Sequence, residues 1–464
     1  MVKIYDSLTK NKLPLDISKN RPVRIYTCGV TVYDHCHIGH GRSLYTFDYI
    51  RNYLVSKGLN VIFIRNITDI DDKILIKAKK IASEENISIN QAWEKTVNTY
   101  INSYYQDLKA LNISQADYEP RATEHIKDII EFTQSLIKKN TAYEKNGSVY
   151  FRVRRFPEYG KLSHKNIDDL LNSVRIENDP EKEDPLDFAL WKKAKENEVY
   201  WDSPWGKGRP GWHIECSVMA NKYLGDTLDI HGGGRDLIFP HHENEIAQSE
   251  SLTGKTFAKI WMHHGLISID SQKMSKSLKN FVTLKEFLNK YSSDTLKIFY
   301  LSAHWRSPLD FTQKKIEEAD RIRERLYALW QKVKNFEEIN ITDRDLTSLK
   351  EKFTSSMDDD FNAPKAIACL FDLITLVYKN ENNTKFLKQA KKIAFYIFDV
   401  FSLFKSEREL DKDTIAYIET KISERKILRA RRQYQQADAI RQELLKQNIV
   451  LEDAKNGETR WRIK

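Results

Sequence analysis

The order of a strand, a helix and a second strand near the amino terminus most restricts the fold of this chain. Residues 23–30 (VRIYTCGV) are apolar and β-branched and predict a strand, residues 44–58 have helical spacing and end at Gly58, and residues 60–68 (NVIFIRNIT) predict a second strand. The same order returns later, with a strand at 226–234, a helix at 240–252 and a strand at 260–267. We therefore predict an α/β fold with a doubly wound parallel sheet, in which ligands bind beyond the carboxyl ends of the strands.

The rest of the sequence predicts an insertion in the sheet domain and a helical carboxyl-terminal part. Residues 143–153 predict a hairpin over an Asn-Gly turn, and residues 154–200 are polar and irregular. The pattern is helical from about residue 310, and residues 449–464 predict a second small hairpin. We expect six segments, namely the first half of the sheet domain (1–120), an inserted connective subdomain (121–200), the second half of the sheet domain (201–265), a loop and stem-contact region (266–315), a helical bundle (316–405) and a terminal module (406–464).

Composition and charge indicate a globular protein of a reducing compartment. The 464 residues contain no run near the ~18 apolar residues of a membrane span, and the amino terminus has no export signal, so we expect a cytoplasmic protein without a membrane partner. Four scattered cysteines do not suit a disulfide framework and are candidates for free thiols or metal ligands. The net charge is +9, and residues 425–464 hold 11 Lys and Arg against 5 Asp and Glu. This basic tail indicates a nucleic-acid contact, although a solvated helix face is the commoner meaning of such a run.

Two short motifs follow predicted strands of the same sheet domain. In HIGH (37–40), His37 and His40 flank Gly39 at a helix start, where a triphosphate can approach the backbone and the helix dipole favours anions. In KMSKS (273–277), Lys273 and Lys276 lie on a loop and can hold a leaving pyrophosphate. Each motif alone is more often a polar helix start or a solvated basic loop. Together, in this order, they predict nucleotide activation by stabilisation of charge, without a protein nucleophile.

The segment HGGGRDLIFPHHENE (231–245) predicts part of a metal site. His241 and Glu245 are four residues apart in the predicted helix, so they share one face, and both are zinc-ligand types. At the same spacing His242 is paired with Ile246, which cannot bind a metal. The periodicity therefore favours His241 over His242.

Cysteine thiolates are the expected partners of this helix face. Cys216 and either Cys28 or Cys36 could supply them from neighbouring strand ends, and spacing does not decide between the last two. The alternative is that these cysteines are small buried apolar residues, which is the usual place of a free cysteine.

Longer stretches resemble the cysteinyl-tRNA synthetase family of the class I aminoacyl-tRNA synthetases. The matching segments are YTCGVTVYDHCHIGH (26–40), RNITDIDDKI (65–74), PGWHIECSVM (210–219), DIHGGGRDLIFPHHENEIAQSE (229–250) and DDDFNAPKAI (358–367). The resemblance implies a Rossmann-like catalytic domain that uses ATP with Mg²⁺ to form cysteinyl-adenylate from L-cysteine and then passes the cysteinyl group to tRNA(Cys). We expect the protein to be a monomer.

The resemblance also implies a set of site residues and one zinc ion per chain. It selects Cys28 over Cys36, so that the implied zinc ligands are Cys28, Cys216, His241 and Glu245. It further implies substrate contacts by Thr68, Trp212 and His231, and ATP contacts by His37, Gly39, His40 and Lys276. The alternatives for the substrate contacts are core packing, a strand-end cap and support of a ligand. Zinc would bind the thiolate of cysteine and reject the hydroxyl of serine by about 10⁴ or more, so that no editing domain is needed.

The basic tail has a pattern of its own. On a single helix over residues 423–447, one apolar stripe would hold Ile427, Ala430, Tyr434, Ala437, Ile440 and Leu444 and leave the arginines exposed. The expected tRNA contacts are Arg431, Arg432, Arg460, Trp461 and Arg462, with Trp461 stacked on an unpaired base. The alternative is a surface helix with a tryptophan buried against it.

Two other functions fit parts of the sequence. A ligase that joins cysteine to an amino sugar would use the same catalytic motifs, but would not need the basic module of residues 423–464. A non-catalytic, zinc-dependent protein that binds RNA or senses cysteine would not need HIGH and KMSKS.

Overall fold

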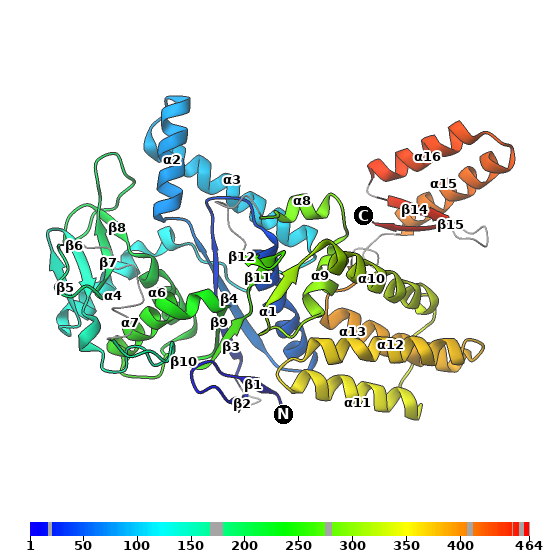
Figure 1. Cartoon of the computed structure of the whole chain (residues 1–464), viewed down its shortest axis with the longest axis horizontal. Coiled ribbons are helices and arrows are strands. Elements are labelled where there is room, and N and C mark those ends of the chain that lie inside the picture. Colours follow the sequence, from blue (N-terminus) through cyan, green and yellow to red (C-terminus); the bar gives the residue numbers. More distant parts are fainter. Residues whose placement is uncertain are drawn as a thin grey trace. The chain divides into compact units, whose positions relative to one another are not determined.

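The computed structural model describes residues 1–16, 21–167, 180–273, 281–405, 412–447, 449–453 and 459–463, which form two compact units (Figure 1). The first unit consists of Met1–Lys285, Tyr300–Thr312 and Ser348–Cys369. The second consists of Glu286–Phe299, Gln313–Thr347 and Leu370–Lys464. Each unit combines segments that are distant in the sequence, and the six segment boundaries expected above stay a prediction.

Four parallel strands form the central sheet of the first unit. In spatial order they are β10 (Ala258–His264), β9 (Leu228–Gly234), β3 (Val23–Thr31) and β4 (Val61–Thr68). Every residue of β9 is buried, as expected for a strand in a parallel sheet that is covered on both faces. The predicted parallel sheet is therefore confirmed. The chain leaves β3 toward β4 on one side and reaches β9 on the other, so a ligand crevice is expected at the carboxyl ends of β3 and β9.

The helices that connect these strands differ from the predicted ones at their starts. α1 (Ile38–Ser56) begins earlier than predicted because the side chain of His37 caps it. α7 (Glu243–Thr253) begins later, after an irregular turn at Ile238–His242. Pro240 has no N–H for the helix, and Phe239 is extended, with φ −138° and ψ 133°.

The chain between β4 and β9 forms helices and a small antiparallel sheet. Its helices are α2 (Asp72–Glu85), α3 (Ile89–Ala110), α4 (Ile126–Lys138) and α6 (Trp212–Leu224). Its strands pair in the order β5 (Ala142–Lys145), β6 (Ser148–Phe151), β7 (Phe188–Lys193) and β8 (Gly208–Pro210). The predicted hairpin is confirmed, since Asn146 and Gly147 both have positive φ between β5 and β6.

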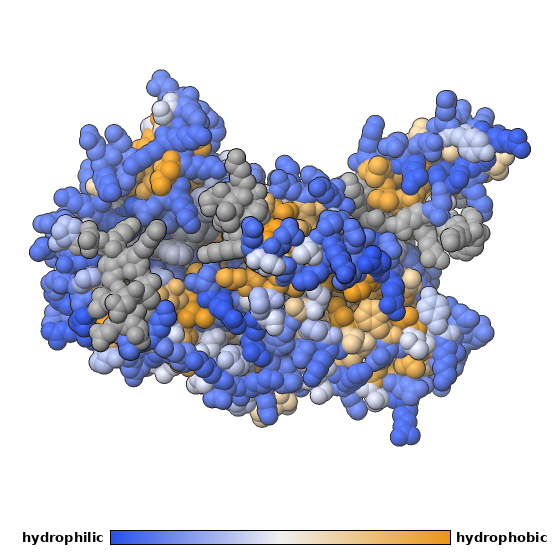
Figure 2. Space-filling model, viewed as in Figure 1, coloured by the Kyte–Doolittle hydropathy of each residue, from blue (hydrophilic) through white to orange (hydrophobic). Residues whose placement is uncertain are grey.

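One hydrophobic core joins this inserted part to the central sheet. Tyr26 of β3 and Ile64 of β4 belong to the same buried cluster as Phe151, Trp191 and Ile246. The inserted part is therefore anchored to the sheet that carries the expected site. On the face of the molecule drawn in Figure 2, hydrophilic residues cover most of the described surface and apolar residues show mainly in recesses.

Short elements complete the first unit, and helices dominate the second. The short strands are β1 (Lys3–Tyr5), β2 (Lys12–Pro14), β11 (Ile267–Ile269), β12 (Gln272–Lys273) and β13 (Leu309–Phe311). The later helices are α8 (Leu284–Leu288), α9 (Ser293–Leu301), α10 (Gln313–Val333), α11 (Arg344–Asp358), α12 (Ala363–Lys379), α13 (Thr384–Val400), α15 (Lys412–Ala430) and α16 (Tyr434–Lys446). They are followed by the predicted terminal hairpin of β14 (Ile449–Asp453) and β15 (Thr459–Ile463). Among the described residues, no helix has both the length and the apolar composition that crossing a membrane requires.

Candidate active site and metal centre

The HIGH segment starts α1, and its two histidines stack on each other. The ring centroids of His37 and His40 are 3.7 Å apart, with 13° between the ring planes. His37 Nδ1 accepts the backbone N–H of Gly39 at 3.1 Å and of His40 at 3.2 Å, and His40 Nδ1 accepts the backbone N–H of His37 at 3.3 Å. A neutral imidazole that accepts at Nδ1 carries its proton on Nε2. The cap therefore makes both rings Nε2–H donors, and it already engages the backbone N–H of Gly39.

The backbone beside HIGH pairs with the segment that follows KMSKS. Ile38 N donates to Val282 O at 3.0 Å, and Leu284 N donates to Cys36 O at 2.8 Å. This pairing places residues 282–284, which follow the KMSKS motif in the sequence, beside the HIGH segment. The joint action of the two motifs stays a prediction. Lys273 is the last residue of β12 and its side chain is not described, and Lys276 lies outside the described residues.

The four predicted metal ligands lie close together in the structure, although they come from three separate parts of the sequence. They are Cys28 of β3, Cys216 of α6, His241 of the turn before α7 and Glu245 of α7. Cys28 Sγ lies 3.7 Å from Cys216 Sγ and 3.3 Å from Glu245 Oε1. His241 Nε2 lies 3.1 Å from Glu245 Oε1. One ligand atom from each residue lies within 4.8 Å of the others, a spacing at which one metal ion can contact all four.

One detail of the predicted set is wrong, because Cys216 comes from a helix and not from a strand end. α6 begins after Gly211, and its buried residues, which include Ile214 and Met219, do not follow the alternation of a strand. Cys216 itself is 1% exposed. The thiol of Cys216 therefore comes from a helix that packs against the sheet, and it approaches Cys28 of β3.

A second set of candidate ligands shares Cys28 and Glu245 with the first. His242 Nε2 lies 3.2 Å from Cys28 Sγ and 3.9 Å from Glu245 Oε1. His231 Nε2 lies 2.8 Å from Glu245 Oε2. These four residues also bring their ligand atoms within 4.8 Å of one another. The four-residue spacing was therefore not a sufficient reason to exclude His242 as a metal ligand. The irregular turn directs both His241 and His242 toward Glu245.

Each of the two adjacent histidines is oriented by a further histidine. His241 Nδ1 lies 2.8 Å from His213 Nδ1, and His242 Nδ1 lies 2.8 Å from His263 Nε2. A metal-binding imidazole usually has such a hydrogen bond at its second nitrogen. Sequence reasoning did not identify His213 and His263, since single histidines in a helix and a strand carry no spacing signal.

Electrostatics favour a cation between these groups. The hydrogen bond from Cys28 lowers the pKa of Cys216 to about 6, against the effect of burial. Burial alone would lower the pKa of His241, but its hydrogen bonds to Cys216 and Glu245 raise it to about 10. Burial also opposes ionisation of Glu245, yet His231 and His241 hold the pKa of this carboxyl well below its usual range. A thiolate and a carboxylate buried together need positive charge, which a divalent metal ion can supply.

A bulge in β3 aims Cys28 into this cluster. The pairing of β3 with β4 shifts between Thr27 and Val30, and Gly29 N donates to Asn66 Oδ1 at 2.9 Å. A Cβ atom on Gly29 would lie 1.6 Å from the carbonyl oxygen of Asn66, so only glycine allows this close approach. Asn66 was not singled out in the sequence, although it lies in the matching segment RNITDIDDKI.

Replacement of Gly29 by alanine is expected to destabilise the protein by about 3 kcal/mol and to lower its metal content, because β3 must move away from Asn66. Urea unfolding and metal analysis of the dialysed protein would measure the two effects. Gly254→Ala is the control, since Gly254 has φ 68° and a Cβ atom there would meet nothing within 4 Å, so only a backbone cost of about 1 kcal/mol is expected. Equal effects of the two substitutions would contradict the packing argument.

The predicted substrate contacts lie around the cluster. Thr68 is buried at the end of β4, where Asn66 Nδ2 donates to its hydroxyl at 3.3 Å. Trp212 is 40% exposed, and its ring centroid lies 4.4 Å from that of His241. His231 is fully buried, stacks on Trp261 and holds Glu245, which favours its support of the ligands over direct contact with a substrate. The substrate roles of these residues stay predictions.

The structure of the carboxyl-terminal module differs from the prediction in two ways, which concern the helix over residues 423–447 and Trp461. Residues 423–447 do not form one helix, since α15 and α16 are separated at residues 431–433, where Arg432 has φ 58°. Consequently Ile427 and Tyr434, assigned to a buried stripe, are 54% and 58% exposed.

The second difference concerns the side chain of Trp461, which was predicted to stack on an unpaired base. It belongs to the buried cluster of this module with Ile440 and Leu451, so the predicted stacking on a base is wrong and the buried alternative holds. Arg431 and Arg432 are exposed, whereas the side chains of Arg460 and Arg462 are not described.

Comparison with known proteins places this architecture in a family. Residues 14–321 match the family model of the class I (C) tRNA synthetase catalytic domain, and residues 352–405 match the model of the DALR domain. The cysteine–tRNA ligase of Thermodesulfovibrio yellowstonii is 45% identical over 494 residues, covering 100% of both chains. That of Anoxybacillus flavithermus is 47% identical over 478 residues, covering 99% of each.

Solved structures agree on the fold. The methionyl-tRNA synthetase of Mycobacterium tuberculosis in complex with methionyl-adenylate has a TM-score of 0.60 at 14% identity, with 82% of this chain and 92% of that chain covered. At such identity the likeness concerns the fold alone. The fold, the HIGH segment and the full-length relatives lead to one conclusion: the chain belongs to the cysteine–tRNA ligase family of the class I aminoacyl-tRNA synthetases.

Proposed function

We propose that this enzyme joins L-cysteine to tRNA(Cys) in two steps, and that Cys28, Cys216, His241 and Glu245 hold the zinc ion that selects the substrate thiol. In the first step a carboxylate oxygen of cysteine attacks the α-phosphorus of ATP, and the bond to the leaving pyrophosphate breaks. In the second step a ribose hydroxyl of the terminal adenosine attacks the carbonyl carbon, and AMP leaves. The convergence of two thiols, an imidazole and a carboxylate carries this proposal.

The donor set fits zinc in both chemistry and size. Zinc bonds of about 2.3 Å to sulfur, 2.0–2.1 Å to nitrogen and 2.0–2.2 Å to carboxylate oxygen give tetrahedral edges of about 3.3–3.8 Å between ligand atoms. The separations of 3.7 Å between the two sulfurs and 3.3 Å between Cys28 Sγ and Glu245 Oε1 lie in this range. The separation of 3.1 Å between His241 Nε2 and Glu245 Oε1 lies 0.2 Å below it. When bound, zinc would supply a thiophilic Lewis acid that favours the thiolate of cysteine over the hydroxyl of serine.

The side chains around the zinc ligands would orient them and shape the pocket. His213 and His231 keep His241 and Glu245 in place through the hydrogen bonds described above. Trp212, with an exposed ring beside His241, would close over the small substrate side chain, and Thr68 would bind its polar backbone groups.

The phosphates of ATP would lie at the start of α1. His37 and His40 would donate from Nε2 to the phosphoryl oxygens as charge builds in the transition state, and Gly39 would allow close approach of the backbone. Lys273 and Lys276 would hold the departing pyrophosphate, and Mg²⁺ would accompany ATP. The backbone pairing between residues 36–38 and 282–284 supports this joint action.

The terminal module supports tRNA as the acceptor over an amino sugar. Both relatives named above are cysteine–tRNA ligases and match this chain over its whole length, including the basic module of residues 423–464. Arg431 and Arg432 are exposed there, and no ion pair to a described carboxylate engages them, so they can face tRNA phosphates. We further infer a cytoplasmic monomer.

Zinc content and substrate selection together test this proposal. The purified enzyme is expected to hold one zinc ion per chain and to catalyse ATP–pyrophosphate exchange with cysteine at least about 10⁴ times more efficiently than with serine. A protein without zinc that still discriminates between the two amino acids would contradict the metal role. Absence of exchange with cysteine would contradict the enzymatic proposal, and cysteine transfer to an aminoglycoside but not to tRNA would favour the amino-sugar ligase.

A further inference from the structure

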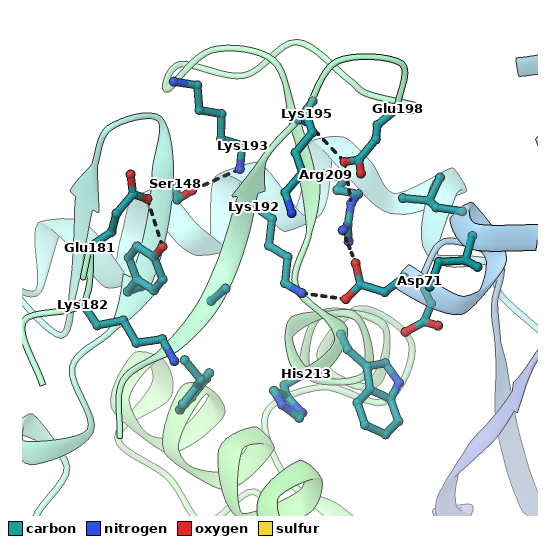
Figure 3. A pocket seen from close by; sticks show the side chains of 18 of the residues that line it. Asp71, Ser148, Glu181, Lys182, Lys192, Lys193, Lys195, Glu198, Arg209 and His213 are labelled. Atoms are coloured by element: carbon teal, nitrogen blue, oxygen red, sulfur yellow. Dashed lines mark hydrogen bonds and ion pairs between the residues drawn. The ribbon is translucent and has the colours of Figure 1, made fainter. Parts of the chain in front are cut away.

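The pocket drawn in Figure 3 borders the metal cluster and not the HIGH histidines. It encloses about 1240 Å³ between α2, the small sheet of the inserted part and the start of α6. Trp212 and His213 line it, whereas neither His37 nor His40 does. The geometry at the phosphate end of the site must therefore be set by other contacts, which lie around α1.

Arg42 is a buried arginine of α1, two residues after His40. It is 1% exposed, and its guanidinium donates to four main-chain carbonyl groups. The acceptors are Leu266 at 3.1 Å, Ser307 at 2.6 Å, and His304 and Trp305 at 3.4 Å each. No carboxylate of the described residues is among its partners, although buried charges are usually paired with an opposite charge. Burial lowers the pKa of Arg42 to about 10, so this side chain stays charged at neutral pH. A buried positive charge therefore holds two main-chain segments against α1.

These two segments are the starts of two paired strands. Leu266 directly precedes β11, and residues 304–307 lie just before β13. β11 pairs with β13 in parallel, and it pairs with β12 in the opposite direction, with Ser268 opposite Lys273. Lys273 is the first residue of KMSKS. Arg42 thus contacts the start of the small sheet that carries this lysine.

The chain after KMSKS is attached to the HIGH segment in a different way. Residues 282–284 pair with residues 36–38 through main-chain groups, and the hydroxyl of Tyr300 donates to Ile38 O at 2.6 Å. None of these bonds uses the side chain of Arg42. A substitution of Arg42 is therefore expected to loosen the chain before KMSKS and to leave the pairing after it in place.

We infer that Arg42 is a positioning residue of adenylate formation, which fixes Lys273 relative to the two HIGH histidines through the sheet of β11, β12 and β13. The inference rests on the proposed function, which assigns Lys273 to the departing pyrophosphate. A lysine stabilises the transition state only where its ammonium group meets the developing charge, and a displacement of about 1 Å costs about 10²-fold in rate. Glutamine is shorter than arginine and cannot reach both segments, so Arg42→Gln would displace Lys273 without changing a zinc ligand.

A double-mutant cycle with the full-length, zinc-loaded enzyme tests this link. Cysteine-dependent ATP–pyrophosphate exchange is measured for the wild type, Arg42→Gln, Lys273→Ala and the double variant. Arg42→Gln is expected to lower kcat by about 10–10²-fold with an unchanged KM for cysteine. In the Lys273→Ala background, which lacks the ammonium group, the same substitution is expected to lower kcat at most about twofold. Equal fold-losses in the two backgrounds would overturn the inference.

A second variant covers the case in which Arg42→Gln does not fold. Arg42→Lys keeps the positive charge but loses the planar group that reaches several carbonyls at once. Its loss of kcat is expected to be smaller than that of Arg42→Gln and to disappear likewise in the Lys273→Ala background. Urea unfolding shows which of the two variants is folded, and equal losses in both backgrounds would overturn the inference for either one.

A buried arginine of the second unit controls for loss of stability. Arg323 of α10 is 3% exposed and pairs with Asp320 at 3.1 Å. Arg323→Gln is expected to destabilise the protein, but any loss of kcat should be equal in the wild-type and Lys273→Ala backgrounds. If Arg323→Gln showed the same dependence on Lys273, instability alone would explain the result and the inference would fail. Absence of exchange by the wild-type enzyme would contradict the proposed function instead.

Discussion

Replacing Cys216 by serine is expected to remove the bound metal and to lower cysteine-dependent pyrophosphate exchange by at least about 10²-fold. Cys216 Sγ lies 3.7 Å from Cys28 Sγ, and its pKa is lowered to about 6, so it can act as a thiolate ligand near neutral pH. A serine hydroxyl has the same shape but does not ionise there. Zinc analysis after dialysis against a chelator, together with the exchange assay, would measure both effects.

A histidine variant distinguishes the two candidate ligand sets. If zinc binds Cys28, Cys216, His241 and Glu245, His242→Asn should retain the metal while His241→Asn loses it. If zinc binds the set that contains His231 and His242, the outcome is reversed and Cys216→Ser keeps its zinc. Cys369→Ser is the control, because Cys369 is a buried cysteine that belongs to neither set, and it should keep full zinc content. Thermal melts of each variant would separate metal loss from unfolding.

The sheet could be predicted from the sequence because its signals are local. The apolar, β-branched runs that became β3, β4, β9 and β10 are buried strands. The predicted helices between β3 and β4 and between β9 and β10 imply that these strands pair in parallel. The helix break at residues 431–433 could not be predicted in the same way. The apolar residues between positions 427 and 444 have the spacing of one helical stripe. Ile427 and Tyr434 are nevertheless exposed, because the chain breaks into two helices, α15 and α16, that pack against each other.

Only part of the candidate metal site could be predicted from spacing in the sequence. The four-residue spacing identified His241 and Glu245, but the choice of Cys28 needed the family resemblance, because no spacing rule connects residues on different elements. The place of His242 in the second candidate ligand set could not be predicted, because helical periodicity does not apply to the turn at Ile238–His242, before α7 begins. Asn66 could not be found either, because its contact with Gly29 arises from a bulge that depends on the pairing of two strands.

Replacement of His40 by asparagine is expected to lower the rate of adenylate formation by about 10²–10³-fold while stability changes by at most about 1 kcal/mol. The structure separates the two nitrogens of this ring. Nδ1 accepts the backbone N–H of His37 in the helix cap, so Nε2 carries the ring proton that a phosphate oxygen could accept. The Oδ1 atom of asparagine occupies nearly the position of Nδ1, so the substitution keeps the cap and removes only the Nε2 donor.

His40→Gln is the matched comparison, since its amide reaches the position of Nε2 and can still donate a hydrogen bond. We therefore expect the glutamine variant to retain more exchange activity than the asparagine variant, although its loss of the cap acceptor makes it the less stable of the two. Cysteine-dependent ATP–pyrophosphate exchange at saturating substrates would measure activity, and urea unfolding would measure stability. Wild-type exchange in His40→Asn would refute the phosphate role. Equal losses in both variants, in proportion to their instability, would mean that His40 acts only as part of the cap.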